Sequence, residues 1–176
     1  MASPVEPVIV EVFRYHCWAN ASLFRFCESL TPGQLASSAL GTYGEVYKTL
    51  RHIAVTEQWY VADIRGEQRV DPIASGEAPD VRMLGEYIAR SGQSLIEVAA
   101  KMSMTDYARW SDRGQDESML AVRLAIQALD HGSEHRAQVR TILSQIGIEP
   151  PEIDGWAYDA FQPDKGDYLL DGPRNV

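Results

Sequence analysis

The chain has 176 residues, of which 45% are apolar and 23% are charged, and its formal net charge is -9 at pH 7. This composition is ordinary for a globular protein, and the length is sufficient for one domain with its own core, which we expect to cover residues 1–176. The acidic balance, without a basic stripe, argues against a nucleic-acid partner. The lack of a leader pattern or of an apolar run near about 18 residues argues against a membrane span and predicts a cytoplasmic protein.

Apolar residues that recur at helical spacing predict four long helices, over about residues 4–30, 43–66, 80–102 and 119–146. On the first helix one face is expected to hold Val8, Val12, Tyr15, Ala19 and Leu23, with Ile9, Phe13, His16 and Cys27 beside them. Cys17 and Cys27 would lie about 15 Å apart along the same helix, which is too far for a disulfide. We therefore expect a reducing compartment.

Residues that favour helix ends mark several boundaries. Thr31 predicts the N-cap of a short helical turn, and Asp80 predicts the N-cap of the third long helix. Asp116 or Ser118 is expected to cap the fourth long helix, and Gly147 is expected to end it.

Four amphipathic helices around one core predict an all-α four-helix bundle. Residues 107–114 are ambiguous and fit a short extended segment with a turn. Residues 152–176 form a tail rich in Gly, Pro and Asp, which we expect to pack on the bundle through its aromatic residues, Trp156, Tyr158 and Phe161.

Two of the four histidines, His131 and His135, are four residues apart in the fourth predicted helix. Residues at this spacing share a helix face, so both imidazoles can reach one metal ion. They belong to the apolar stripe of Leu124, Ala128, His131, His135, Val139, Ile142 and Ile146. The pair indicates a metal site, and the alternative is that each is a core histidine bonded to a neighbour.

A metal site needs at least one further ligand, which should come from another helix. Only His16 and His52 remain. His52 is mid-helix with Val55 and Trp59 on its own face, which favours His52 as the third ligand. His16 also lies beside an apolar stripe, so periodicity alone does not choose between the two.

Three stretches of the chain carry a family resemblance. They are Tyr15-His16-Cys17-Trp18-Ala19-Asn20, then Leu50-Arg51-His52-Ile53 followed by Glu57-Gln58-Trp59, and finally His131-Gly132-Ser133-Glu134-His135-Arg136-Ala137-Gln138. In this order they resemble the DinB-like (DinB/YfiT) proteins, small bacterial four-helix bundles that bind metal. The chain departs from the family pattern at Glu134, which is often His, and at Ala137, which is often Gly.

The resemblance implies that the metal ligands are His52, His131 and His135, and not His16. Three imidazoles leave an open coordination position, as in catalytic sites, and suit Zn or Ni first, with Fe or Co as alternatives. Protons compete for imidazole, so occupancy is expected to fall below about pH 6. The resemblance also implies a metal-dependent S-transferase or isomerase that uses a low-molecular-weight thiol such as bacillithiol, mycothiol or glutathione. The expected partners are that thiol, a small-molecule substrate and a second copy of the chain in a homodimer.

Two other functions stay open at this stage. The stretch from His131 to His135 also fits the inverted zinc-peptidase pattern, with Glu134 as the general base of a metallohydrolase. Such peptidases take a distant downstream Glu ligand in a much larger domain, which disfavours this alternative. The other is a non-enzymatic metal-binding or stress-related protein.

Several remaining residues are expected to serve the structure. Asn20 is unfavourable in a helix interior, which indicates a buried hydrogen bond or a polar pocket. Arg136 is expected in a structural ion pair rather than on a substrate anion. Trp18 and the two cysteines are expected to pack in the core.

Overall fold

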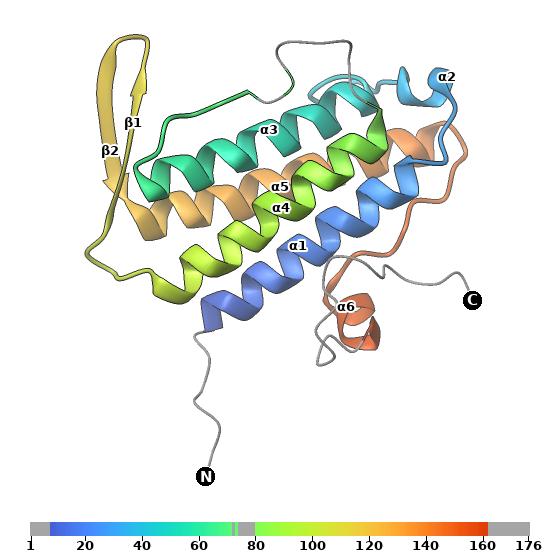
Figure 1. Ribbon diagram of the computed structural model, residues 1–176. Helices are drawn as coiled ribbons and strands as arrows, with labels where there is room; N and C mark the ends of the chain where they lie inside the picture. The colour runs from blue at the N-terminus through green and yellow to red at the C-terminus, as the bar shows by residue number, and fades with distance from the viewer. Residues whose placement is uncertain (1–7, 72, 74–79, 162–176) are drawn as a thin grey trace.

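Four long helices pack together in the computed structural model, which describes residues 8–71, 73 and 80–161 (Figure 1). They are α1 (Val8–Cys27), α3 (Val46–Arg65), α4 (Val81–Lys101) and α5 (Ala121–Gln145). The shorter elements are α2 (Pro32–Leu35), β1 (Tyr107–Asp112), β2 (Gln115–Leu120) and α6 (Gly155–Phe161). The predicted four-helix bundle is confirmed, with a small hairpin added to it. The first residues of the first predicted helix, and residues 162–176 of the tail, lie outside the described part.

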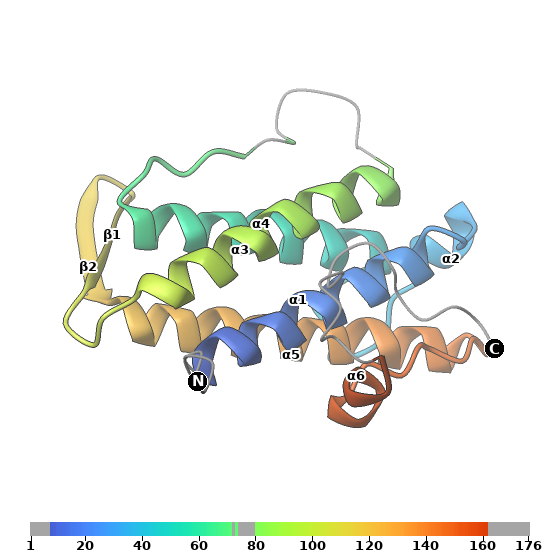
Figure 2. The same cartoon turned by 60° about the horizontal axis from the view of Figure 1, so that its bottom comes forward.

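The main contacts between the long helices run in the order α1, α4, α3, α5 and back to α1. Figures 1 and 2 show α3 and α5 side by side and running in opposite directions, while α1 and α4 form the other side of the bundle. α6 lies against α1, and the hairpin lies where α3 and α4 end and α5 begins.

Local hydrogen bonds set several helix ends as predicted. Thr31 caps α2, where its hydroxyl accepts from the Gln34 backbone N–H and the Gln34 side chain accepts from the Thr31 N–H. Asp80 caps α4 by accepting from the Met83 N–H at 2.8 Å. Gly147 has φ +79° directly after the last residues of α5, a conformation that glycine adopts without strain.

The predicted cap of the fourth long helix is wrong, because Asp116 and Ser118 belong to β2. Their backbones pair with Ser111 and Arg109 of β1, and α5 begins at Ala121 without a side-chain cap. The two-residue turn of the hairpin is Arg113-Gly114, with φ values of +49° and +80°, as the favoured type I′ hairpin turn requires. The extended segment expected at residues 107–114 is therefore the first half of a hairpin.

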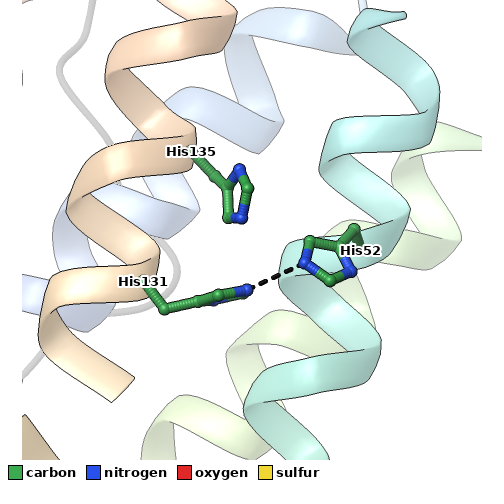
Figure 3. Close-up of side chains that lie close together, drawn as sticks. All are labelled: His52, His131 and His135. Atoms are coloured by element: carbon green, nitrogen blue, oxygen red, sulfur yellow. Dashed lines mark hydrogen bonds between the residues drawn. The ribbon is translucent and has the colours of Figure 1, made fainter. Parts of the chain in front are cut away.

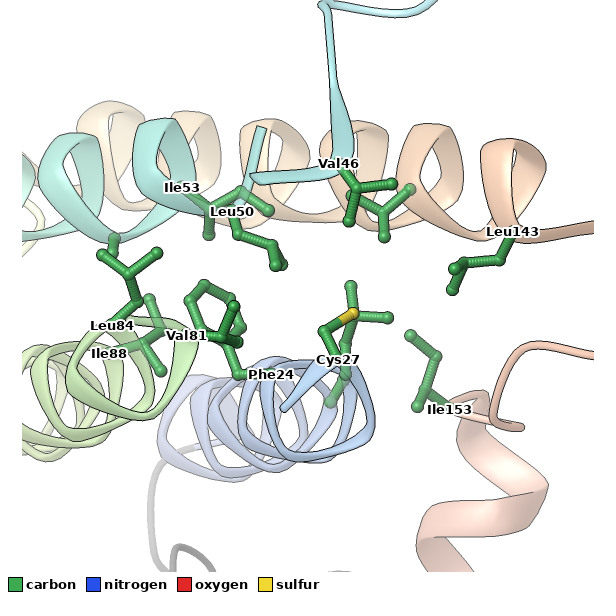
Figure 4. Close-up of a cluster of buried hydrophobic side chains, with 14 of the residues drawn as sticks. Phe24, Cys27, Val46, Leu50, Ile53, Val81, Leu84, Ile88, Leu143 and Ile153 are labelled. Carbon is green, nitrogen blue, oxygen red and sulfur yellow. The ribbon is translucent and has the colours of Figure 1, made fainter. Parts of the chain in front are cut away.

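Large apolar side chains from all four long helices fill the core. Figure 4 shows part of it, and the residues labelled there are Phe24, Cys27, Val46, Leu50, Ile53, Val81, Leu84, Ile88, Leu143 and Ile153. Cys17 and Cys27 are free and buried, and burial raises the pKa of the Cys27 thiol to about 12. Both cysteines and Trp18 therefore pack as expected.

The buried side of α1 differs from the predicted face at its first turns. Val8 is 78% exposed and Val12 is 38% exposed, whereas Val10 and Phe13 are buried. Nearly all of these positions are apolar, so the pattern of this stretch did not show which side would meet α4.

Two of the three C-terminal aromatic residues pack against α1. The Tyr158 ring lies 5.3 Å from the Trp18 ring between centroids, and its hydroxyl donates to Glu11 Oε1 at 2.9 Å. The Phe161 ring lies 5.9 Å from Trp18. Trp156 is 85% exposed, which corrects the expectation that all three aromatic residues would pack.

No helix in the described part of the chain is both long and apolar enough to cross a membrane.

Truncating a buried leucine of α4 should destabilise the bundle far more than truncating its exposed neighbour. Leu84 is fully buried, whereas Met83 is 41% exposed. We expect Leu84→Ala to lower the free energy of unfolding by about 2–5 kcal/mol, because it removes buried atoms and leaves a cavity. Met83→Ala should lower it by less than about 1 kcal/mol. Urea denaturation followed by circular dichroism measures both, and equal losses would contradict this packing of α4.

Candidate metal centre

Three histidines from two helices converge at the interface of α3 and α5. His52 comes from the middle of α3, and His131 and His135 come from successive turns of α5 (Figure 3). One ring nitrogen from each lies within 4.8 Å of the others. The Nε2 atoms of His52 and His131 are 2.9 Å apart. The structure therefore brings together the three residues that the family resemblance implies, and together they form a cluster that could bind a metal ion.

Two rings of the cluster have a lowered pKa. Burial lowers the pKa of His52, and the neighbouring His135 lowers it further. Burial likewise lowers the pKa of His131 to about 3, with smaller effects from His135, His52 and His16. Neutral imidazoles are the form that binds metal. Burial therefore favours the metal-binding form of His52 and His131.

Hydrogen bonds at the far side of two rings orient them toward the centre of the cluster. His135 Nδ1 is 2.9 Å from Gln138 Oε1, and because an amide oxygen only accepts, the proton is on Nδ1 and the lone pair is on Nε2. His52 Nδ1 lies 3.3 Å from Thr56 Oγ1, which leaves Nε2 facing His131. Such outer hydrogen bonds fix the tautomer and ring orientation of metal-binding histidines.

The donor set fits a divalent transition metal with an open position. The Nε2 atoms of His52 and His131 lie within hydrogen-bond distance of each other and face the position that an ion would take. Among the described residues, no cysteine or carboxylate joins the three histidines in the cluster. Three imidazoles suit Zn, Ni, Fe or Co, and without a fourth protein ligand they leave room for a small molecule.

Two tyrosines border the cluster. The Tyr43 ring stacks on His52 at 4.2 Å between centroids with an interplanar angle of 13°, and it meets His135 edge-on at 5.2 Å. The backbone N–H of Tyr43 donates to Gln138 Oε1 at 3.0 Å, so one amide oxygen holds both this loop and His135. The Tyr60 ring meets His131 edge-on at 5.7 Å. No sequence pattern pointed to Tyr43, whereas Gln138 is found at helical spacing from His135.

The other candidates from the sequence lie outside this cluster. His16 is fully buried and bonds to Glu57 at 2.7 Å, so neither His16 nor Glu57 serves the three rings directly. Glu134 is exposed, and its Oε1 accepts from Gln138 Nε2 at 3.1 Å.

The low pKa of His131 makes the stability of the metal-free protein depend on pH. Between about pH 6.5, the ordinary histidine value, and the folded value of about 3, the unfolded chain binds a proton at His131 that the folded chain does not. The free energy of unfolding should therefore fall as pH is lowered through this window, and the lowered pKa of His52 acts in the same direction.

Urea unfolding with a chelator present, measured at several pH values, tests this expectation. His131→Gln should show a weaker loss of stability on acidification than the wild type, because one of the protons is no longer taken up. Carboxylates titrate equally in both proteins, so they cancel in the comparison. Identical pH dependences would contradict the burial of a neutral His131.

Comparison with known proteins agrees with this structure. No curated protein matches the chain. The model of the DinB family matches residues 1–166, a span that includes all four long helices and the three histidines of the cluster. The chain therefore belongs to the DinB family.

Proposed function

We propose that the chain is a metal-dependent thiol transferase whose divalent ion is bound by His52, His131 and His135. The observation that carries the metal site is the convergence of the three imidazoles, with ring nitrogens within 4.8 Å of one another. The open coordination position supports a catalytic rather than a structural ion. The thiol chemistry rests on the activities that the resemblance to DinB-like proteins implies, and Zn or Ni fits the donor set best.

A bound divalent ion would lower the pKa of a coordinated thiol, making its sulfur nucleophilic near neutral pH. His52, His131 and His135 would hold the ion. The activated sulfur would form a bond to an electrophilic carbon while the leaving group departed with its electron pair, and the thiol proton would pass to solvent. Gln138 keeps the lone pair of His135 Nε2 directed into the cluster. The Tyr43 ring stacks on one face of His52.

Replacing any one of the three histidines should remove most of the bound metal. We expect one divalent ion per wild-type chain, and a large loss in His52→Ala, His131→Ala and His135→Ala, because two imidazoles alone bind weakly. Elemental analysis and metal titration measure the stoichiometry. Glu134→Gln is the matched control, since this exposed neighbour of His135 lies outside the cluster, and it should retain the ion. Full occupancy in His52→Ala would show that the ligands are assigned wrongly.

Thiol consumption should depend on the metal. We expect the metal-loaded protein to couple one of bacillithiol, mycothiol or glutathione to a member of an electrophile panel. A chelator should abolish the reaction, and added metal should restore it. Mass spectrometry of the product measures the transfer.

The controls separate the alternatives. Glu134→Gln should keep the transfer rate within about twofold, whereas a hydrolase that uses Glu134 as its base would lose activity by several orders of magnitude. A protein that binds metal but turns over no thiol would support the non-enzymatic alternative and contradict the transferase.

A further inference from the structure

A buried polar network lies beside the histidine cluster and shares no residue with it. His16 and Asn20 come from α1, Glu57 from α3 and Arg136 from α5, and each is at most 4% exposed. Glu57 Oε2 lies 2.7 Å from His16 Nε2 and 2.8 Å from Asn20 Nδ2. Arg136 Nη1 lies 2.7 Å from Asn20 Oδ1 and 3.3 Å from His16 Nδ1. Ser91 of α4 donates to Glu57 Oε1 at 2.7 Å.

The donors and acceptors of the network allow only one arrangement. Arginine only donates, so His16 Nδ1 accepts from Arg136 and the Nε2–H donates to Glu57. Asn20 faces the same two partners, with its amide NH₂ toward Glu57 and its oxygen toward Arg136. Turning any member would leave a buried polar group unpaired, which is costly. Both nitrogens of His16 are therefore engaged, and α1 is bonded to α3 and α5 at once.

α1 and α5 approach each other closely at Gly132. A Cβ atom at this position would lie 2.4 Å from His16 Cε1 and 3.0 Å from Arg136 Nη1. Glycine is unfavourable inside a helix, and here it leaves the space that the His16 imidazole occupies. Gly132 directly follows His131, and Arg136 directly follows His135. α1 thus holds α5 at the residues next to both of its metal-site histidines.

We propose that His16 and Asn20 are positioning residues for the metal site, which set the spacing of α3 and α5. Glu57 anchors them to the helix of His52, while Gly132 and Arg136 anchor them to the helix of the other two histidines. α1 itself contributes no ligand, and its role is to hold the three imidazoles at the separation that one ion needs. This inference rests on the metal site proposed above.

Gly132→Ala tests the proposal because it forces His16 and α5 apart while retaining every polar side chain of the network. Wild type and variants are titrated with Co²⁺, whose visible absorption reports coordination geometry, and the dissociation constant is measured. We expect Gly132→Ala to bind one Co²⁺ per chain about 10- to 100-fold more weakly, the usual cost of disturbing a site's supporting contacts, and with a changed spectrum. Asn20→Ala removes one link between Glu57 and Arg136 and should have the same effect.

Two controls separate positioning from stability. Gly85→Ala is the same substitution on α4, where the added Cβ would meet only ordinary contacts, 3.5 Å from Glu28 Oε1 and 3.9 Å from Phe24 Cβ. Leu84→Ala weakens the core without touching the network. Both should keep the wild-type affinity for Co²⁺ and the wild-type spectrum, even where thermal unfolding shows a less stable protein.

The possible results are distinct. Wild-type affinity and spectrum in a folded Gly132→Ala or Asn20→Ala would overturn the proposal. An equal loss of affinity in Leu84→Ala would also overturn it, because binding would then follow stability. If neither network variant folds, as judged by circular dichroism, the network serves folding alone and the proposal fails. If the wild type itself binds no Co²⁺, the proposed metal site is contradicted. This result is obtained before any variant is measured, so it is distinct from a failure of the positioning proposal.

Discussion

The arrangement of the bundle depends on a buried carboxylate, that of Glu57. Removing a charge from water costs several kcal/mol unless it is paired and hydrogen-bonded. Glu57 receives hydrogen bonds from His16, Asn20 and Ser91, and the Arg136 guanidinium nearby provides the opposite charge. These partners come from three other helices, so all four long helices meet at one charge. Apolar packing tolerates small shifts between helices, whereas this set of hydrogen bonds holds in a single register.

The histidine cluster lies beside this network and differs from it in burial. His52 and His131 are partly buried, whereas the four residues of the network are buried. His135 is buried like the network, so two of the three imidazoles are more exposed than any network residue. The network residues connect the long helices, and the three imidazoles beside them form the cluster that could bind a metal ion. Gln138 extends the cluster, because its oxygen connects His135 to the loop of Tyr43.

The hairpin is joined to the same region through a second buried charge. Asp63, near the end of α3, is fully buried and accepts two hydrogen bonds from Arg69, at 2.8 and 2.7 Å. The Arg69 guanidinium lies 5.6 Å from the Trp59 ring centroid and 5.5 Å from that of Trp110 on β1. A bidentate ion pair and two cation–π contacts thus fasten β1 to α3. Tyr60, which borders the histidine cluster, lies on α3 between Trp59 and Asp63, the two α3 residues that Arg69 contacts.

The sequence by itself determined the four helices, the cap at Asp80 and the shared face of His131 and His135, because each depends on interactions within a few residues. It favoured His52 over His16 as the third ligand without excluding His16, since both lie beside apolar stripes, and the family resemblance then implied His52. The second strand of the hairpin was not predicted for a related reason. The pairing of β1 with β2 is a contact between segments, and it overrode the local signals that made Asp116 and Ser118 candidate helix caps. In the tertiary structure, His52 lies across from the pair on α5, and both nitrogens of His16 are engaged in the network. A side chain's partners on other helices are fixed by the packing of whole helices, which no local pattern encodes.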